Sequence, residues 1–174
     1  PAILILTFAW TLKGMGDNLG IGEFVSGTVG ANATASIFIP AVMFGIALFL
    51  AFSTGTSWGT FAILVPIVVE MFKMADEKMM IIAVSAVLAG AVCGDHVSPI
   101  SDTTIMSSAG AQSNHINHVQ TQMQYAMVVA AVCVAGYIIA GICKNWLITL
   151  VISALILVAA ILGIKKYYDK KESV

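Results

Sequence analysis

Hydrophobic residues fill long stretches of this chain, and polar residues interrupt them at only a few places. Uncharged runs extend over residues 31–69, 79–94 and 145–164. A run of about 18 apolar residues is enough to cross a bilayer as a helix, and several of these runs reach that length. The pattern predicts an all-α polytopic membrane protein.

The apolar block over residues 37–72 is too long for a single span. A continuous helix of that length would extend about 54 Å, whereas the hydrocarbon core is about 30 Å thick. The sequence STGTSWGT at residues 53–60 interrupts the block with hydroxyl side chains and glycines. We predict a break there, either a hairpin tip or an unwound helix centre. Such backbone is tolerated in a membrane only where protein buries it or it lines a cavity.

A second interruption, GDHVSPISDTTIMSS at residues 94–108, follows an apolar half-helix. Pro99 lacks a backbone donor, so the helix must be discontinuous. Asp95 and Asp102 lie on either side of Pro99. Placing a carboxylate at the bilayer centre costs about 3 kcal/mol on insertion scales, so the presence of each carboxylate calls for a functional or structural explanation. Carboxylate, hydroxyl (Ser98, Ser101) and freed carbonyl oxygens are hard ligands that suit Na⁺, and a proton can compete for the same carboxylate. Asp102 begins the second half-helix near more oxygens, so we expect it to matter most.

Other interpretations of these residues stay open. The second interruption could be an extramembrane loop in which Asp102 caps the next helix and Asp95 bonds within the turn. The spacing of two further pairs imitates a zinc quartet; these residues are Cys93, His96, His115 and His118. His115 and His118 lie in a predicted polar loop over residues 113–124, either simply solvated or sensing pH.

The flanking segments set the predicted topology. Two ordinary spans are expected near residues 123–143 and 146–164, and the membrane domain is residues 1–164. The tail, residues 165–174, carries four lysines and is expected to be cytoplasmic. The loop at 113–122 is then cytoplasmic and residues 73–78 lie outside.

Lys13 and Asp17 are spaced to pair on one helix face, and residues 23–36 should form a loop or interfacial helix.

Composition narrows the classes of function. The chain is 59% hydrophobic and 10% charged, against about 25% charged residues in soluble domains. A net charge of -1 without any arginine argues against nucleic acid binding. No nucleophile elbow or phosphate loop is present, so neither an enzyme nor a cofactor is expected. The start at Pro1 indicates the C-terminal part of a longer protein. A non-transporting structural subunit stays open, although it gives no account of two polar interruptions.

Three stretches resemble the C-terminal half of the NhaC family of Na⁺/H⁺ antiporters. They are FSTGTSWGTFAILVPI (52–67), CGDHVSPISDTTIMSSAGA (93–111) and NHINHVQTQMQYA (114–126). The resemblance implies Na⁺ extrusion in exchange for H⁺ across a bacterial or archaeal cytoplasmic membrane. It also implies that this chain is the second of two inverted repeats, with a hairpin and a broken helix that move together.

The same resemblance implies a set of binding residues for Na⁺ at the two interruptions. They are Ser53, Thr54, Thr56, Ser57, Asp95, Ser98, Ser101, Asp102, Thr103 and Thr104. Relatives in the family exchange organic acids such as malate and lactate, so an organic acid antiporter is the alternative substrate class. The expected partners are Na⁺, H⁺ and the lipid bilayer, and a homo-oligomer stays open.

Overall fold

The fold is known from a computed structural model, which describes residues 33–72 and 76–172 and a few isolated positions before residue 21. Within these residues every regular element is a helix. The order is α3 (Ala33–Thr54), α4 (Ser57–Phe72), α5 (Glu77–Val97), α6 (Asp102–Gly110), α7 (His115–Cys143) and α8 (Trp146–Glu172). In this part of the chain, four helices are long and apolar enough to cross a membrane, namely α3, α5, α7 and α8. The predicted all-α membrane fold is confirmed.

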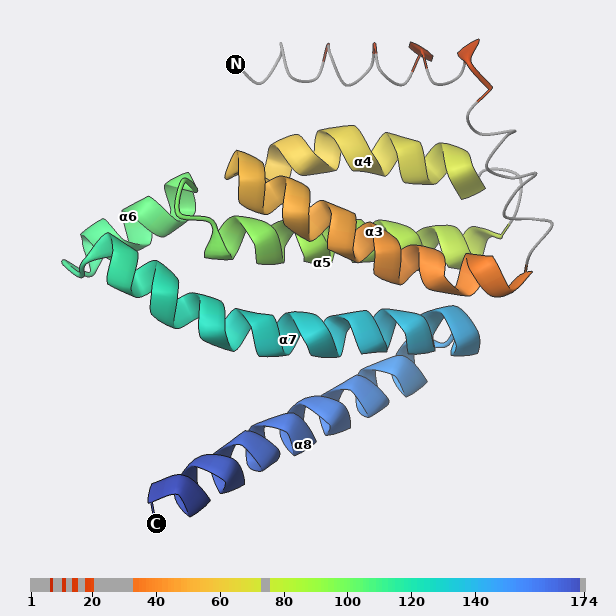
Figure 1. Ribbon diagram of the computed structural model, residues 1–174. Helices are drawn as coiled ribbons and strands as arrows, with labels where there is room; N and C mark the ends of the chain where they lie inside the picture. Colours follow the sequence, from red (N-terminus) through yellow and green to blue (C-terminus); the bar gives the residue numbers. More distant parts are fainter. Residues whose placement is uncertain are drawn as a thin grey trace.

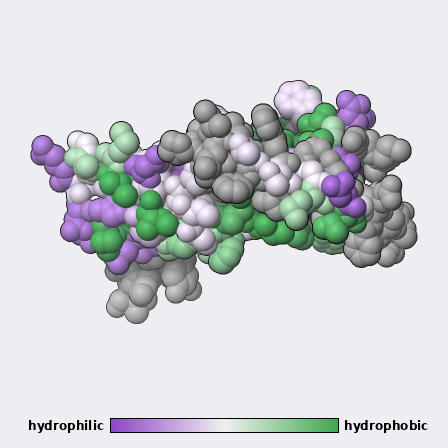
Figure 2. Space-filling model, turned by 90° about the horizontal axis from the view of Figure 1, so that it is seen from above, coloured by the Kyte–Doolittle hydropathy of each residue, from purple (hydrophilic) through white to green (hydrophobic). Residues whose placement is uncertain are grey.

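The helices run back and forth along one axis (Figure 1). α3 and α4 form an antiparallel pair, α5 returns beside them, and α7 runs antiparallel to α5. α6 lies beyond the end of α5, and α8 diverges from the bundle after leaving α7 (Figure 1). Seen from above, hydrophilic residues gather toward the two ends and hydrophobic residues lie between them (Figure 2).

Small residues allow α3 and α5 to pack backbone against backbone. Gly90 and Gly94 are four residues apart, so they lie on the same face of α5. A Cβ atom at either position would overlap a carbonyl oxygen of α3, that of Phe44 or that of Leu48. Ala47 on α3 is fully buried in this contact region. Close approach through small residues is the usual way for apolar helices to associate in a membrane, where lipid is as apolar as the side chains.

α7 covers the other side of the α3–α5 pair. The Tyr137 hydroxyl donates to the carbonyl of Ser85 on α5 at 3.0 Å, and the Tyr137 ring lies 5.6 Å from that of Phe44 on α3. At its C-terminal end α7 has Gly141, where a Cβ atom would overlap the carbonyl oxygen of Ile37. α7 therefore fixes the relative position of α3 and α5 along much of their length.

The predicted polar loop at residues 113–124 is wrong, because α7 begins at His115. Asn114 occupies the N-cap position, where its side-chain oxygen accepts from the backbone N–H of Asn117 at 3.1 Å. An Asn cap satisfies an unpaired amide at a helix start, so polar residues that read as a loop can enter a helix. The tail is also partly helical: α8 continues past residue 164 to Glu172.

The first part of the broken helix is longer than a half-helix. α5 contains 21 residues, or about 31 Å, which is a full span. The break therefore follows a complete apolar helix, and α6 adds 9 residues beyond it. The predicted Lys13–Asp17 pair and residues 73–75 lie outside the described residues. Of the segment 23–36, predicted as a loop or interfacial helix, residues 23–32 also lie outside them, and residues 33–36 belong to α3.

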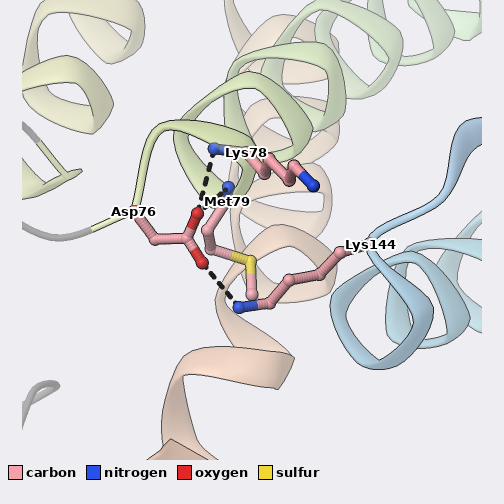
Figure 3. Close-up of polar contacts among 4 residues, drawn as sticks. All are labelled: Asp76, Lys78, Met79 and Lys144. Atoms are coloured by element: carbon pink, nitrogen blue, oxygen red, sulfur yellow. Dashed lines mark hydrogen bonds and ion pairs between the residues drawn. The ribbon is translucent and has the colours of Figure 1, made fainter.

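An ion pair joins two connections at the end of the bundle opposite the breaks (Figure 3). Asp76 precedes α5, and one of its carboxylate oxygens accepts from the backbone N–H groups of Lys78 and Met79. The other oxygen lies 2.5 Å from the Lys144 ammonium group, which follows α7. The hydrogen bond from Lys144 is the main reason why the pKa of the Asp76 carboxyl lies below its ordinary value. The pair places the start of α5 and the end of α7 at the same end of the bundle.

Replacing Lys144 with methionine should lower the stability of the protein slightly and only above acidic pH. Both side chains are partly exposed, so the loss at neutral pH should be below about 1 kcal/mol. A lowered carboxyl pKa stabilises the fold above the unfolded value, 3.8 for a free Asp, and this contribution is lost as pH falls through the folded value. Thermal unfolding in detergent at a series of pH values should show native and variant converging on acidification. A difference that grows on acidification would contradict this assignment.

Candidate ion-binding site

The first break separates α3 from α4 with two residues. Gly55 has a positive φ of 67°, a conformation that side chains with a Cβ rarely adopt. Thr56 follows, and its hydroxyl oxygen accepts from the backbone N–H of Gly59 at 3.3 Å, as an N-cap residue does. The glycine reverses the chain and the threonine starts the next helix, so the break predicted within residues 53–60 is confirmed.

The second break occupies the four residues between α5 and α6. α5 ends at Val97 with Ser98 as its C-cap, and Ser101 is the N-cap residue of α6. The alternative in which Asp102 caps α6 is therefore wrong by one position, because Asp102 is the first residue of the helix. The Ser101 hydroxyl pairs with that of Thr103 at 2.7 Å. A discontinuous helix at Pro99 is confirmed.

The two breaks lie against each other, as predicted. The Ser98 hydroxyl donates to the carbonyl of Phe52, in the last turn of α3, at 2.7 Å. A Cβ atom on Gly55 would lie 2.9 Å from the carbonyl oxygen of Ile100. Residues 46 positions apart therefore form one continuous polar junction, which we call the break junction (residues 52–57 and 95–104).

The two carboxylates differ in burial. Asp95 lies in the last turn of α5 and is only 6% exposed, and its Oδ1 is buried without a hydrogen-bond partner among the described residues. Asp102 is exposed at the start of α6. Sequence reasoning favoured Asp102 because it counted oxygens near the break, whereas burial follows from how α5 packs against α3. Gly94, beside Asp95, makes the closest approach to α3.

Several hydroxyl groups of the break junction already use their hydrogens on nearby carbonyls. Ser53 donates to the carbonyl of Phe49 and Thr54 to that of Leu50, each at 2.8 Å. Thr104 donates to the carbonyl of His96 at 3.0 Å. A hydroxyl has one hydrogen and two lone pairs. These groups can therefore still accept a hydrogen bond or coordinate a cation, but they have no hydrogen left for an anion.

Sequence reasoning missed Gln122 on α7. Its Oε1 is the other buried side-chain oxygen that has no hydrogen-bond partner in the described part of the chain. Like the orphaned oxygen of Asp95, this atom is an acceptor. The only prior signal was a glutamine inside a predicted loop, which carries no expectation of burial. Among the described residues no three His, Cys, Asp or Glu side chains are grouped to hold a metal ion, so the zinc quartet finds no support there.

Comparison with known proteins now bears on these residues. Residues 1–142 match the sequence profile of the Na⁺/H⁺ antiporter family. The chain belongs to this family. An uncharacterized protein of Haemophilus influenzae is 45% identical over 165 residues, which cover 95% of this chain and 32% of that protein. The Malate-2H(+)/Na(+)-lactate antiporter of Bacillus subtilis is 30% identical over 111 residues, covering 61% of this chain and 23% of that protein. No solved structure matches the chain.

The antiporter-family chain thus spans about a third of the length of its Haemophilus relative. The matched family region includes both breaks, α5, α6 and nearly all of α7. α3 and α5 end at the break junction, while α4 and α6 begin there. Helix C-termini carry partial negative charge and N-termini partial positive charge. The backbone of the junction thus provides ends of both signs, and its side chains must decide the sign of a bound ion.

Replacing Gly55 with alanine should destabilise the protein by more than about 1 kcal/mol, because a Cβ atom is strained at positive φ. The same Cβ atom would also press on the backbone of Ile100. Gly110 is the matched control, since a Cβ atom there meets nothing within 4 Å. Thermal unfolding of both alanine variants in detergent gives the comparison. Equal unfolding temperatures for the two variants would show that the breaks are not in contact.

Proposed function

We propose that this chain forms the C-terminal part of a secondary transporter that exchanges Na⁺ for H⁺ across the cytoplasmic membrane. The observation that carries the proposal is the chemistry of the break junction, where oxygen acceptors outnumber free donors. Asp95 contributes an unpartnered buried carboxylate oxygen, and the hydroxyls of Ser53, Thr54, Ser98 and Thr104 donate their hydrogens to carbonyls. Oxygen acceptors of this kind suit a hard cation.

The proposed binding residues share an oxygen at or beside one of the two breaks. They are Ser53, Thr54, Thr56, Ser57, Asp95, Ser98, Ser101, Asp102, Thr103 and Thr104. Among them Asp95 is the principal carboxylate in this proposal, because it is buried where a charge needs a partner. Asp102 is exposed and would act at the entrance to the junction.

Exchange follows from competition at one carboxylate. A proton on Asp95 removes the charge that attracts Na⁺, and bound Na⁺ in turn disfavours protonation. The site therefore holds either Na⁺ or a proton, and the transporter can carry either bound ion across the membrane. The remainder of the full-length protein would supply a second, inverted copy of the hairpin and broken helix, as transporters of this kind often have.

An organic acid antiporter is the second candidate, and two observations favour it. α4 and α6 both begin at the break junction, and helix N-termini attract carboxylates. One relative is named as a malate and lactate antiporter. Against it, neither break contains a lysine or arginine, and Asp102 in the first turn of α6 already complements that helix end. We therefore rank Na⁺ first.

Transport can be tested in everted membrane vesicles that contain the full-length protein and are energised by respiration. Addition of Na⁺ should collapse the pH gradient, because each entering Na⁺ expels protons through the exchanger. Vesicles from cells that lack the protein are the control. A gradient that responds to malate or lactate but not to Na⁺ alone would reverse the order of the two candidates.

Asp95→Asn and Asp102→Asn form a matched pair for the site. Each keeps the size of the side chain and removes its charge and titratable proton. Asp95→Asn should reduce Na⁺-dependent exchange by at least about 100-fold, the equivalent of about 2.7 kcal/mol. Asp102→Asn should mainly raise the Na⁺ concentration for half-maximal exchange. Membrane insertion of both variants is checked by immunoblot, and the opposite ranking of the two variants would make Asp102 the principal carboxylate.

A further inference from the structure

His115 joins three separate elements next to the break junction. It is the first residue of α7 and is half-buried. Its Nε2 lies 2.8 Å from the carbonyl oxygen of Pro99, inside the second break. Its Nδ1 lies 3.0 Å from the hydroxyl oxygen of Ser108, on α6. One imidazole ring therefore contacts the break and α6 from the start of α7.

The two contacts fix where the hydrogens of the ring must be. A carbonyl oxygen only accepts, so Nε2 carries a hydrogen and donates it to Pro99. Ser108 has a single hydroxyl hydrogen, and its oxygen also lies 2.9 Å from the carbonyl of Ile105. In the neutral ring Nδ1 is an acceptor, so the Ser108 hydrogen must choose between Nδ1 and Ile105. In the protonated ring Nδ1 donates to Ser108, whose hydrogen is then free for Ile105.

The protonated ring is thus the only form that makes all three hydrogen bonds at once. On either side of Pro99, Ser98 contacts Phe52 in the last turn of α3 and Ile100 lies against Gly55 in the first break. A shift of the Pro99 carbonyl would therefore change the contact between the two breaks. Within the described residues, the hydrogen-bond partners of the His115 ring are Pro99 and Ser108, neither of which is a proposed binding residue, so an effect on the binding residues would pass through the backbone of the break.

We propose that His115 is a positioning residue that ties the second break and α6 to the start of α7, and that its protonated form makes this tie complete. With the ring protonated, three hydrogen bonds link Pro99, His115, Ser108 and Ile105, and with the ring neutral one of the two at Ser108 is lost. The tie itself does not depend on the proposed function. Its consequence for transport, a break junction held more firmly at acidic pH, does rest on that function.

Other titratable or charged groups lie on the elements packed around His115. They are Asp102 on α6, Glu77, Lys78, Cys93, Asp95 and His96 on α5, His118, Tyr125, Cys133, Tyr137 and Cys143 on α7, and, among the described side chains of α8, Lys165 and Lys166. α3, which also packs on α7, has none within its span. His118 is one turn along the same helix and half-buried as well, and its ring forms no hydrogen bond with the break among the described residues. It is therefore a matched control of the same residue type.

Hydrogen–deuterium exchange of the full-length protein in detergent tests the tie without reference to transport. The readout is the protection of residues 102–114 at about pH 5 and about pH 8, corrected for the chemical exchange rate. His115→Ala removes both contacts and should speed exchange about tenfold at either pH. His115→Gln keeps one donor and one acceptor without a charge. It should match the native protein at the higher pH and lose the extra protection at the lower one.

His118→Gln should behave like the native protein throughout. The proposal is overturned if His115→Ala exchanges within about twofold of the native protein, or if His118→Gln gives the same pattern as His115→Gln. Because His115→Gln is nearly isosteric at the hydrogen-bonding atoms, it keeps the test valid if the alanine variant fails to fold.

The pH profile of Na⁺-dependent exchange in vesicles tests the consequence for transport. The rate of exchange in His115→Gln should lose the change with pH that arises from protonation of His115, and the His118→Gln control should retain that change. The Na⁺ concentration for half-maximal exchange should change little. An unchanged profile would overturn the link to transport. If the native protein does not exchange Na⁺ at all, the proposed function is overturned. The hydrogen–deuterium exchange of residues 102–114 would still test the contacts of His115.

Discussion

The structure depends on the backbone contact between α3 and α5. Gly90 and Gly94 bring the α5 backbone against carbonyl groups of α3, so neither helix can slide without a clash. This contact sets the register of the two helices, and the register places Gly55 against Ile100 and Ser98 against Phe52. The junction of the breaks is thus a consequence of helix packing several residues away. A larger side chain at either glycine would separate two segments that no loop connects directly.

Broken helices in an apolar chain leave carbonyl groups without a backbone partner, and in this chain serine and threonine hydroxyls donate to such carbonyls. In hydrocarbon each unpaired group costs several kcal/mol, about 4 or more by transfer scales. The hydroxyls of Ser98 and Thr104 donate to two such carbonyls, those of Phe52 and His96, and each hydroxyl oxygen keeps a lone pair. These side chains therefore stabilise the irregular backbone and leave oxygen atoms at the contact between the breaks.

The two ends of the bundle are held differently. At one end an ion pair, Asp76 with Lys144, joins the start of α5 to the end of α7. At the other end His115 contacts the second break and α6 through neutral or charged hydrogen bonds. α5 and α7 are therefore fixed to each other at both ends, whereas the span of α8 has none of its apolar window buried inside the described structure.

The sequence by itself determined the membrane class, the helical fold and the positions of both breaks. Each of these follows from local properties: the length of an apolar run, Gly55 in a row of hydroxyls, and Pro99 without an amide hydrogen. Only the tertiary structure decided which carboxylate is buried, that residues 115–124 are helical, and that His115 and Gln122 face inward. Asp95 and Asp102 are chemically alike and lie four and three positions from Pro99 along the chain. Their difference arises because α5 packs against α3 while α6 does not, and burial of that kind depends on contacts between residues far apart in the sequence.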